Sequence, residues 1–236
     1  MRTLLEALTT AYVAQQPDVT FDLQGGGSDL GLEMLKSHQA DMAASSWAPS
    51  KEKLDRLGKA GLALKVTTIA QDGLTLVVNP ANPIRELSLA QSRGIFRGRI
   101  LDWREVGGRA GDILVVSRED GSGSRNAFES LVMDRQPVTP AAIIMPSSQD
   151  VLQYVASHPN AVGYVSMGET TPAVKALAVE GIEPTPQTVK EATYPLIRLL
   201  TIISAAQPPP AVQNFLDFAL SPAGQEVVKT KYAGVR

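Results

Sequence analysis

Short apolar segments alternate with segments of helical periodicity along most of the chain, and this alternation constrains the fold most. Residues 19–23 alternate apolar and polar side chains as a strand does, a glycine-rich turn follows, and Leu30, Leu32 and Leu35 then recur at helical spacing. The same order of strand, polar turn and helix recurs at residues 113–133. Repeated strand–helix units predict an α/β fold.

The periodicity predicts where the individual elements lie. Expected strands cover residues 19–23, 41–46, 66–69, 74–78, 113–116, 142–145, 161–165 and 196–203. Expected helices cover residues 4–12, 30–35, 50–57, 87–96, 125–133, 149–156, 211–220 and 223–229, the last two started by prolines. No long flexible linker separates two independent domains, so any division is expected to be into lobes that share strands.

Composition excludes several classes of function. The 236 residues carry a net charge of −2, and no basic cluster suits a nucleic-acid backbone. There is no cysteine, which excludes disulfides and thiolate metal sites. No apolar run reaches membrane-spanning length, and the first residues lack the pattern of a signal peptide.

Residues 118–125 read Arg-Glu-Asp-Gly-Ser-Gly-Ser-Arg and directly follow an apolar run. Helix N-terminal amides, serine hydroxyls and a guanidinium are donors for an oxyanion, and glycines let an anion approach the backbone closely. Asp120 would repel an anion unless the ligand itself carries a proton, so it favours hydrogen phosphate over sulfate. On residues alone, ordinary turn chemistry and a solvated charge pair remain open alternatives.

Catalytic constellations are missing from the sequence. The two histidines, His38 and His158, each follow a predicted helix and are interpreted as C-terminal caps. No Gly-x-Ser-x-Gly elbow, Walker loop or complete dinucleotide fingerprint occurs. We therefore expect no catalytic residue, no metal site and no cofactor.

Several motifs occur in an order that resembles one known family. The motifs lie at residues 24–28, 40–46, 71–80, 95–108, 118–125, 163–165 and 221–225. They resemble, across nearly the whole chain, the phosphate-binding proteins of bacterial ABC phosphate transporters.

The resemblance implies a two-lobed type II periplasmic-binding-protein fold, with a ligand cleft between the lobes and two strands as hinge. Residues 1–77 plus 194–236 would form lobe I and residues 78–193 lobe II. The hinge would consist of the strand at 74–78 and the return near 194–197.

The resemblance also assigns site residues. Arg118 would pair with phosphate, Asp120 would accept its proton, and Ser122, Gly123 and Ser124 would donate hydroxyl or amide hydrogens. The remaining implied residues are Ser28 and Ser46 as donors from lobe I, and Gly27 and Arg125 behind the ligand contacts. From the residues alone, other roles remain open: an N-cap for Ser28, which is compatible with ligand contact, a turn serine for Ser46 and a helix-surface arginine for Arg125.

Two departures from the family pattern stand out. Trp47 occupies a position where relatives often carry arginine or another polar group. The family's opening strand and first hydroxyl-rich loop precede the helix that begins here at Leu4. Either the native protein carries them ahead of Met1, or it lacks them, and only the second alternative would leave a central strand position unfilled and a sheet edge open.

The implied function is capture of inorganic phosphate for delivery to the permease subunits of an ABC transporter. The expected protein is a monomer that binds no nucleic acid and is periplasmic or extracellular and membrane-associated. The alternatives are a phosphate-sensing or other oxyanion-binding module of the same fold that is not coupled to transport, and an enzyme acting on phosphate esters.

Overall fold

The computed structural model describes residues 1–50, 52, 54–55 and 63–235. The chain divides into two compact units, Met1–Asp72 with Arg198–Arg236 (unit 1) and Gly73–Ile197 (unit 2). The boundaries expected from the sequence, at 77/78 and 193/194, lie close to these positions. Each unit is described by itself below.

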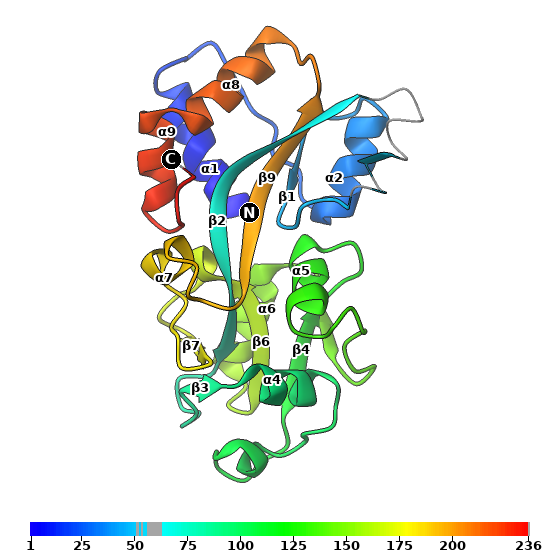
Figure 1. The fold of residues 1–236 in the computed structure, drawn as a ribbon, viewed down its shortest axis with the longest axis vertical. Helices are drawn as coiled ribbons and strands as arrows, with labels where there is room; N and C mark the ends of the chain where they lie inside the picture. The colour runs from blue at the N-terminus through cyan, green and yellow to red at the C-terminus, as the bar shows by residue number, and fades with distance from the viewer. Residues whose placement is uncertain (51, 53, 56–62, 236) are drawn as a thin grey trace. The chain divides into compact units, whose positions relative to one another are not determined.

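Figure 1 shows the order of the elements along the chain. The helices are α1 (Arg2–Val13), α2 (Gly27–Lys36), α4 (Leu89–Phe96), α5 (Gly123–Leu131), α6 (Ser148–Ser157), α7 (Pro186–Lys190), α8 (Pro210–Leu220) and α9 (Pro222–Lys229), with 3-10 turns η1 (Trp103–Val106) and η2 (Met167–Glu169). The strands are β1 (Met42–Ser45), β2 (Leu64–Val78), β3 (Glu86–Leu87), β4 (Leu114–Arg118), β5 (Ile143–Met145), β6 (Ala161–Ser166), β7 (Lys175–Ala176), β8 (Ala178–Val179) and β9 (Ile197–Ala205).

Helix starts are encoded locally. The hydroxyls of Ser88, Ser122 and Ser147 accept a hydrogen bond from the backbone N–H three residues later, which satisfies a donor that the helix itself leaves unused. Helices α8 and α9 begin with Pro210 and Pro222, as the sequence predicts, because a missing N–H costs nothing in the first turn.

Unit 1 holds the sheet order β1-β9-β2. Strand β1 pairs antiparallel with β9, from Met42 opposite Ser204 to Ser45 opposite Thr201. The buried faces of α1, α8 and α9 form an apolar core with β2 and β9, in which Leu8 and Phe215 are at most 2% exposed.

Unit 2 holds the sheet order β2-β6-β4-β5. Strand β2 is antiparallel to β6, whereas β6, β4 and β5 are mutually parallel. Helix α6 packs Val151 and Val155 against this sheet. Arg118 lies opposite Met145 in the β4–β5 register, so the loops that follow these two strands begin side by side.

The structure corrects two element predictions. Residues 19–23 are extended but belong to no strand, because no ladder partner lies beside them among the described residues. The strands expected at 66–69 and 74–78 are one strand, β2. The helix expected at 50–57 falls partly outside the described residues.

Strand β2 continues through residues 71–73 because the polar side chain of Asp72 is paired inside the core. The carboxylate of Asp72 accepts a hydrogen bond from Arg198 Nε of β9 at 2.9 Å, the same carboxylate oxygen lies 2.8 Å from Arg198 Nη2, and both side chains are fully buried. A carboxylate can lie inside this buried strand because it is ion-paired and hydrogen-bonded. A buried charge without such a partner would strongly destabilise the fold.

The histidines lie at helix ends, as predicted. His158 is the C-cap residue of α6, and its Nδ1 lies 2.8 Å from the Tyr154 carbonyl oxygen. His38 follows the C-cap of α2 in a left-handed conformation with φ of 56°. No general-base role follows from either position.

Candidate functional site: an anion-type loop in unit 2 and a serine pair in unit 1

The loop between β4 and α5 turns tightly into the helix. Gly121 adopts φ of 81°, a left-handed conformation that glycine accepts without strain. Ser122 is the N-cap, and its Oγ accepts from the Arg125 N–H at 3.4 Å. The helix starts at Gly123, two residues before the predicted start, so Gly123 and Ser124 lie in its first turn.

The first turn of α5 carries a partial positive charge. N–H groups in the first turn of a helix lack intrahelical acceptors, and the helix dipole adds to their attraction for anions. Ser122 is 2% exposed and Ser124 6% exposed, so both hydroxyls are held in a largely dry environment. The arrangement suits an oxyanion that is desolvated on binding.

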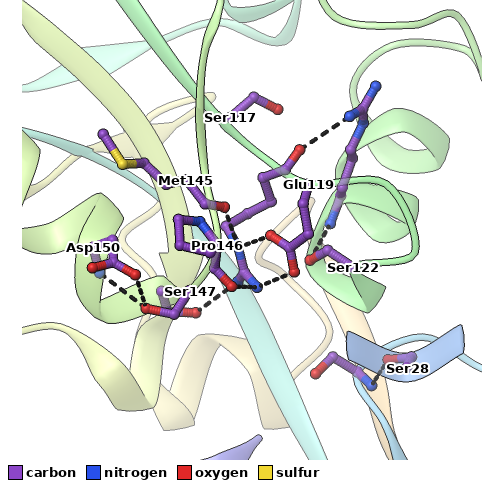
Figure 2. Close-up of polar contacts among 12 residues, drawn as sticks. Ser28, Ser117, Glu119, Ser122, Met145, Pro146, Ser147 and Asp150 are labelled. Atoms are coloured by element: carbon purple, nitrogen blue, oxygen red, sulfur yellow. Dashed lines mark hydrogen bonds and ion pairs between the residues drawn. The ribbon is translucent and has the colours of Figure 1, made fainter. Parts of the chain in front are cut away.

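Arg118 ends β4 and is held by several acceptors. Its Nε and Nη2 each lie 2.8 Å from a carboxylate oxygen of Glu119, a bidentate pairing. Nε also donates to the Met145 carbonyl at 3.2 Å and Nη2 to the Pro146 carbonyl at 3.3 Å, which Figure 2 shows beside Glu119. Nη1 donates to Ser148 Oγ at 3.2 Å. The guanidinium therefore ties the β4 loop to the β5 loop, with its charge balanced by Glu119.

Asp120 points to solvent. Its side chain is 95% exposed, and one carboxylate oxygen lies 2.7 Å from Arg125 Nη1. A proton acceptor in this position is hydrated, so its interaction with a ligand is screened until water is displaced.

Arg125 is largely buried, at 18% exposed, and contacts more than Asp120. It pairs with Glu129 at 2.9 Å and donates to the Arg118 carbonyl at 3.0 Å. Burial lowers the pKa of Arg125, but the hydrogen bond and charge of Glu129 outweigh it, so the pKa is raised. Arg125 thus holds the loop in place through these contacts. A helix-surface arginine, in contrast, would have its guanidinium in solvent.

Tyr164 of β6 supports the end of β4, and sequence reasoning gave it no role. Its hydroxyl lies 2.8 Å from Ser117 Oγ and accepts from the Arg118 N–H at 3.3 Å, while its ring stacks on Phe128 of α5. Burial raises the pKa of Tyr164 to about 12, so the hydroxyl stays protonated. The signal was present, since a lone phenol in an apolar strand needs a partner.

Ser147 and Ser148 form a second strand–turn–helix junction, also missed from the sequence. Ser147 caps α6 by accepting from the Asp150 N–H at 3.1 Å, and its hydroxyl donates to the Asp150 carboxylate (Figure 2). The parallel pairing of β4 with β5 brings this junction next to Arg118. A serine pair directly after a predicted strand was the available clue.

Ser28 and Ser46 come together inside unit 1. Ser28 Oγ accepts from the Ser46 N–H at 3.3 Å, and each residue is 8% exposed. Ser28 is not the N-cap, since α2 is capped by Gly26 and starts at Gly27 with φ of 89°. The two serines and residues 118–125 belong to different units, so each group is described by itself.

Among residues 1–50, 52, 54–55 and 63–235, no group of three or more histidine and carboxylate side chains could hold a metal ion. Across that described part, no helix combines the length and apolar character needed to cross a bilayer.

The family model described as "PBP superfamily domain" matches residues 1–223. The chain belongs to this superfamily, and the α/β fold of that type predicted from the sequence is confirmed.

Individual relatives of the chain have names that refer to phosphate. The chain is 29% identical over 233 residues to the phosphate-binding protein PstS of Bacillus subtilis (strain 168), which covers 98% of this chain and 75% of the relative. A solved structure from Clostridium perfringens, a putative phosphate ABC transporter substrate-binding protein with bound phosphate, is 31% identical with a TM-score of 0.92 and covers 99% of this chain and 95% of that one. An ABC-type phosphate transport receptor from Vibrio cholerae is 32% identical with a TM-score of 0.79, covering 98% and 95%.

Proposed function

We propose that this chain binds inorganic phosphate, as hydrogen phosphate, and releases it without chemical change. The observation that carries the proposal is the buried turn Ser122–Ser124 at the N-terminus of α5. The relatives' names, each of which refers to phosphate, give independent support.

In unit 2, the first-turn amide of Gly123 and the hydroxyls of Ser122 and Ser124 donate to the phosphate oxygens. The cap role of Ser122 is compatible with this, because its oxygen accepts from Arg125 while its proton remains available to a ligand. Amide dipoles and hydroxyls compensate the lost hydration of the anion without bringing net charge.

Arg118 and Asp120 have different tasks. One N–H of Arg118 Nη1 donates to Ser148, and the second is the proposed ligand donor, so the pairing with Glu119 need not break. Asp120 accepts the proton of hydrogen phosphate, and it repels sulfate, which has no proton to give. Arg125 holds Asp120 in place for this contact.

In unit 1, Ser28 and Ser46 are the proposed donors, with Gly27 allowing close approach of the backbone at the start of α2. The hydroxyl of Ser28 already orients the Ser46 amide, so the pair is organised before ligand arrives.

The biological role that follows is delivery of phosphate to an ABC permease in the membrane, by a monomer outside the cytoplasm. The solved relatives are described as transporter substrate-binding protein and transport receptor, which supports this role. The described site combines amides, hydroxyls and charge-paired arginines, a set that favours binding over turnover.

The test is calorimetric titration of the purified chain with phosphate and then sulfate, together with an assay for release of phosphate from a generic phosphate ester. We expect saturable phosphate binding, much weaker sulfate binding and no turnover. Equal affinity for the two anions would remove the proton-acceptor role, and turnover of the ester would replace the binding function by an enzymatic one.

A further inference from the structure

A tyrosine side chain of β6 binds the main chain at the end of β4. Within the described part of the chain, the parallel ladder between these two strands ends at the pair Val115–Val162, whereas β4 continues in register with β5 as far as Arg118. The Arg118 N–H donates to the Tyr164 hydroxyl at 3.3 Å. A side-chain oxygen thus takes the place that a strand carbonyl has in a parallel ladder.

The orientation of the Tyr164 hydroxyl is fixed by Ser117. The two hydroxyl oxygens lie 2.8 Å apart, and the two residues are at most 1% exposed. Because the phenol oxygen accepts from the Arg118 N–H, its own proton has to point elsewhere, and Ser117 Oγ is the acceptor that the described residues place within reach. The serine therefore keeps a lone pair of the phenol oxygen turned toward Arg118.

The Tyr164 ring is held just as firmly. It lies parallel to the ring of Phe128 of α5, with centroids 4.1 Å apart and an interplanar angle of 2°, and Phe96 of α4 packs against it at 5.8 Å. One side chain therefore contacts both the residue at which the β4–α5 loop begins and the helix to which that loop leads. Arg125 of the same helix donates to the Arg118 carbonyl at 3.0 Å, so the N–H and the C=O of Arg118 are each bound by a side chain.

These contacts bear on where the Arg118 guanidinium points. Glu119 and the β5 loop hold the far end of this side chain, and the Tyr164 hydroxyl holds its main-chain end. A side chain fixed at both ends presents its remaining N–H in one direction, which lowers the ordering cost of binding a ligand. Without the hydroxyl, the buried Arg118 N–H would lose its partner, and the end of β4 would have to move to find another.

We propose that Tyr164 is a positioning residue for phosphate binding. Its hydroxyl fixes the main chain of Arg118, and through it the direction of the guanidinium donor, without touching the ion. This inference rests on the proposed function of the β4–α5 loop, and it adds a residue of β6 to the groups on which phosphate affinity depends.

Tyr164→Phe tests the proposal, because it keeps the ring and its stacking and removes the hydroxyl. Calorimetric titration of the full chain with phosphate is expected to give a Kd raised at least about fivefold, as for residues of one hydrogen-bond network. Without phosphate, the Arg118 amide hydrogen is expected to exchange with solvent faster than in the wild-type chain. Urea unfolding verifies that the variant is fully folded under the titration conditions.

Tyr154→Phe is the control, since it removes a phenol hydroxyl from the same unit. The Tyr154 ring stacks on His158, and within the described part of the chain its hydroxyl has no hydrogen bond to residues 117–125. We expect an unchanged Kd for phosphate in this variant.

A second pair of variants separates positioning of Arg118 from a general effect on the fold. Arg118→Met keeps a long side chain and removes the guanidinium, and its weaker phosphate binding is followed by amide NMR. Adding Tyr164→Phe to Arg118→Met is expected to change Kd by less than about twofold, because the hydroxyl acts through the guanidinium. A merely structural role would weaken binding by the same factor in both backgrounds.

The outcomes distinguish this inference from the proposed function. A wild-type chain that binds no phosphate overturns both. Phosphate binding that Tyr164→Phe leaves within about twofold of the wild type overturns this inference alone, as does an equal loss of affinity with and without the Arg118 guanidinium. If Tyr164→Phe does not fold, Ser117→Ala, which removes the acceptor that orients the hydroxyl, replaces it in the same titrations and is read by the same outcomes.

Discussion

Replacing Ser122 by alanine removes one hydroxyl that has two proposed tasks, capping α5 and donating to phosphate. Loss of a serine cap costs about 0.5–2 kcal/mol of folding free energy. Loss of a hydrogen bond to a charged group costs about 1.5–3 kcal/mol of binding free energy, which is about tenfold to somewhat more than a hundredfold in Kd. Because Ser122 is only 2% exposed, water does not easily replace the missing donor.

Ser147→Ala is the matched control. Ser147 caps helix α6 by the same kind of bond, its Oγ accepting from the N–H of the third residue at 3.1 Å against 3.4 Å for Ser122, and it has no proposed ligand contact. Its hydroxyl also donates to the Asp150 carboxylate. Urea unfolding should show a loss of stability in both variants, at least as large in Ser147→Ala because that hydroxyl also donates to Asp150. Calorimetry should show weakened phosphate binding only in Ser122→Ala, and equal affinity in the two variants would refute the assignment of Ser122 as a ligand donor.

Three further predictions concern charge and burial. Asp120→Asn should lower the ratio of phosphate to sulfate affinity, while Glu129→Gln, which removes the other carboxylate from Arg125, should leave that ratio unchanged in paired titrations. Asp72→Ala should lower the free energy of unfolding by about 3–5 kcal/mol, because the fully buried charge of Arg198 loses the Asp72 carboxylate. A loss under ~1 kcal/mol in urea unfolding would contradict this. Burial raises the pKa of Tyr164 from 10.0 to about 12, so the unfolded chain ionises first and stability falls as pH rises through this interval. Tyr164→Phe should reduce that fall in urea unfolding on either side of pH 10, and an identical pH profile would argue against it.

Much of the fold was predictable because short-range sequence signals determine where many of its elements begin and end. Strand–turn–helix order, the serines that cap helices and the prolines that start α8 and α9 are all short-range signals. Strand β2 was divided in the prediction because a polar residue inside an apolar run normally marks a turn. Asp72 is acceptable there only through Arg198, which lies 126 positions away.

Residues 19–23 show the converse error: the sequence predicts a strand that the described residues do not form. Their side chains alternate as a strand requires, but a strand exists only with a partner, and pairing is a property of the assembled sheet. Sequence pattern therefore located the extended backbone correctly and assigned it a ladder that the described residues do not form.

The candidate loop was found from its composition, but its internal pairing was not. That Arg118 is bound by Glu119 follows from neighbours in sequence, whereas its contacts with Met145, Pro146 and Ser148 depend on the β4–β5 register. Tertiary pairing decides which donors remain for a ligand, and local sequence does not contain it.

The central claim is that the first turn of α5 holds the anion. Phosphate titration followed by amide NMR of the labelled chain tests it most directly. The account predicts that the Gly123 amide shifts and saturates with the same Kd as calorimetry, while the amide of Ser157, at the C-terminal end of α6, changes little. Phosphate binding that leaves the Gly123 amide unmoved would contradict it.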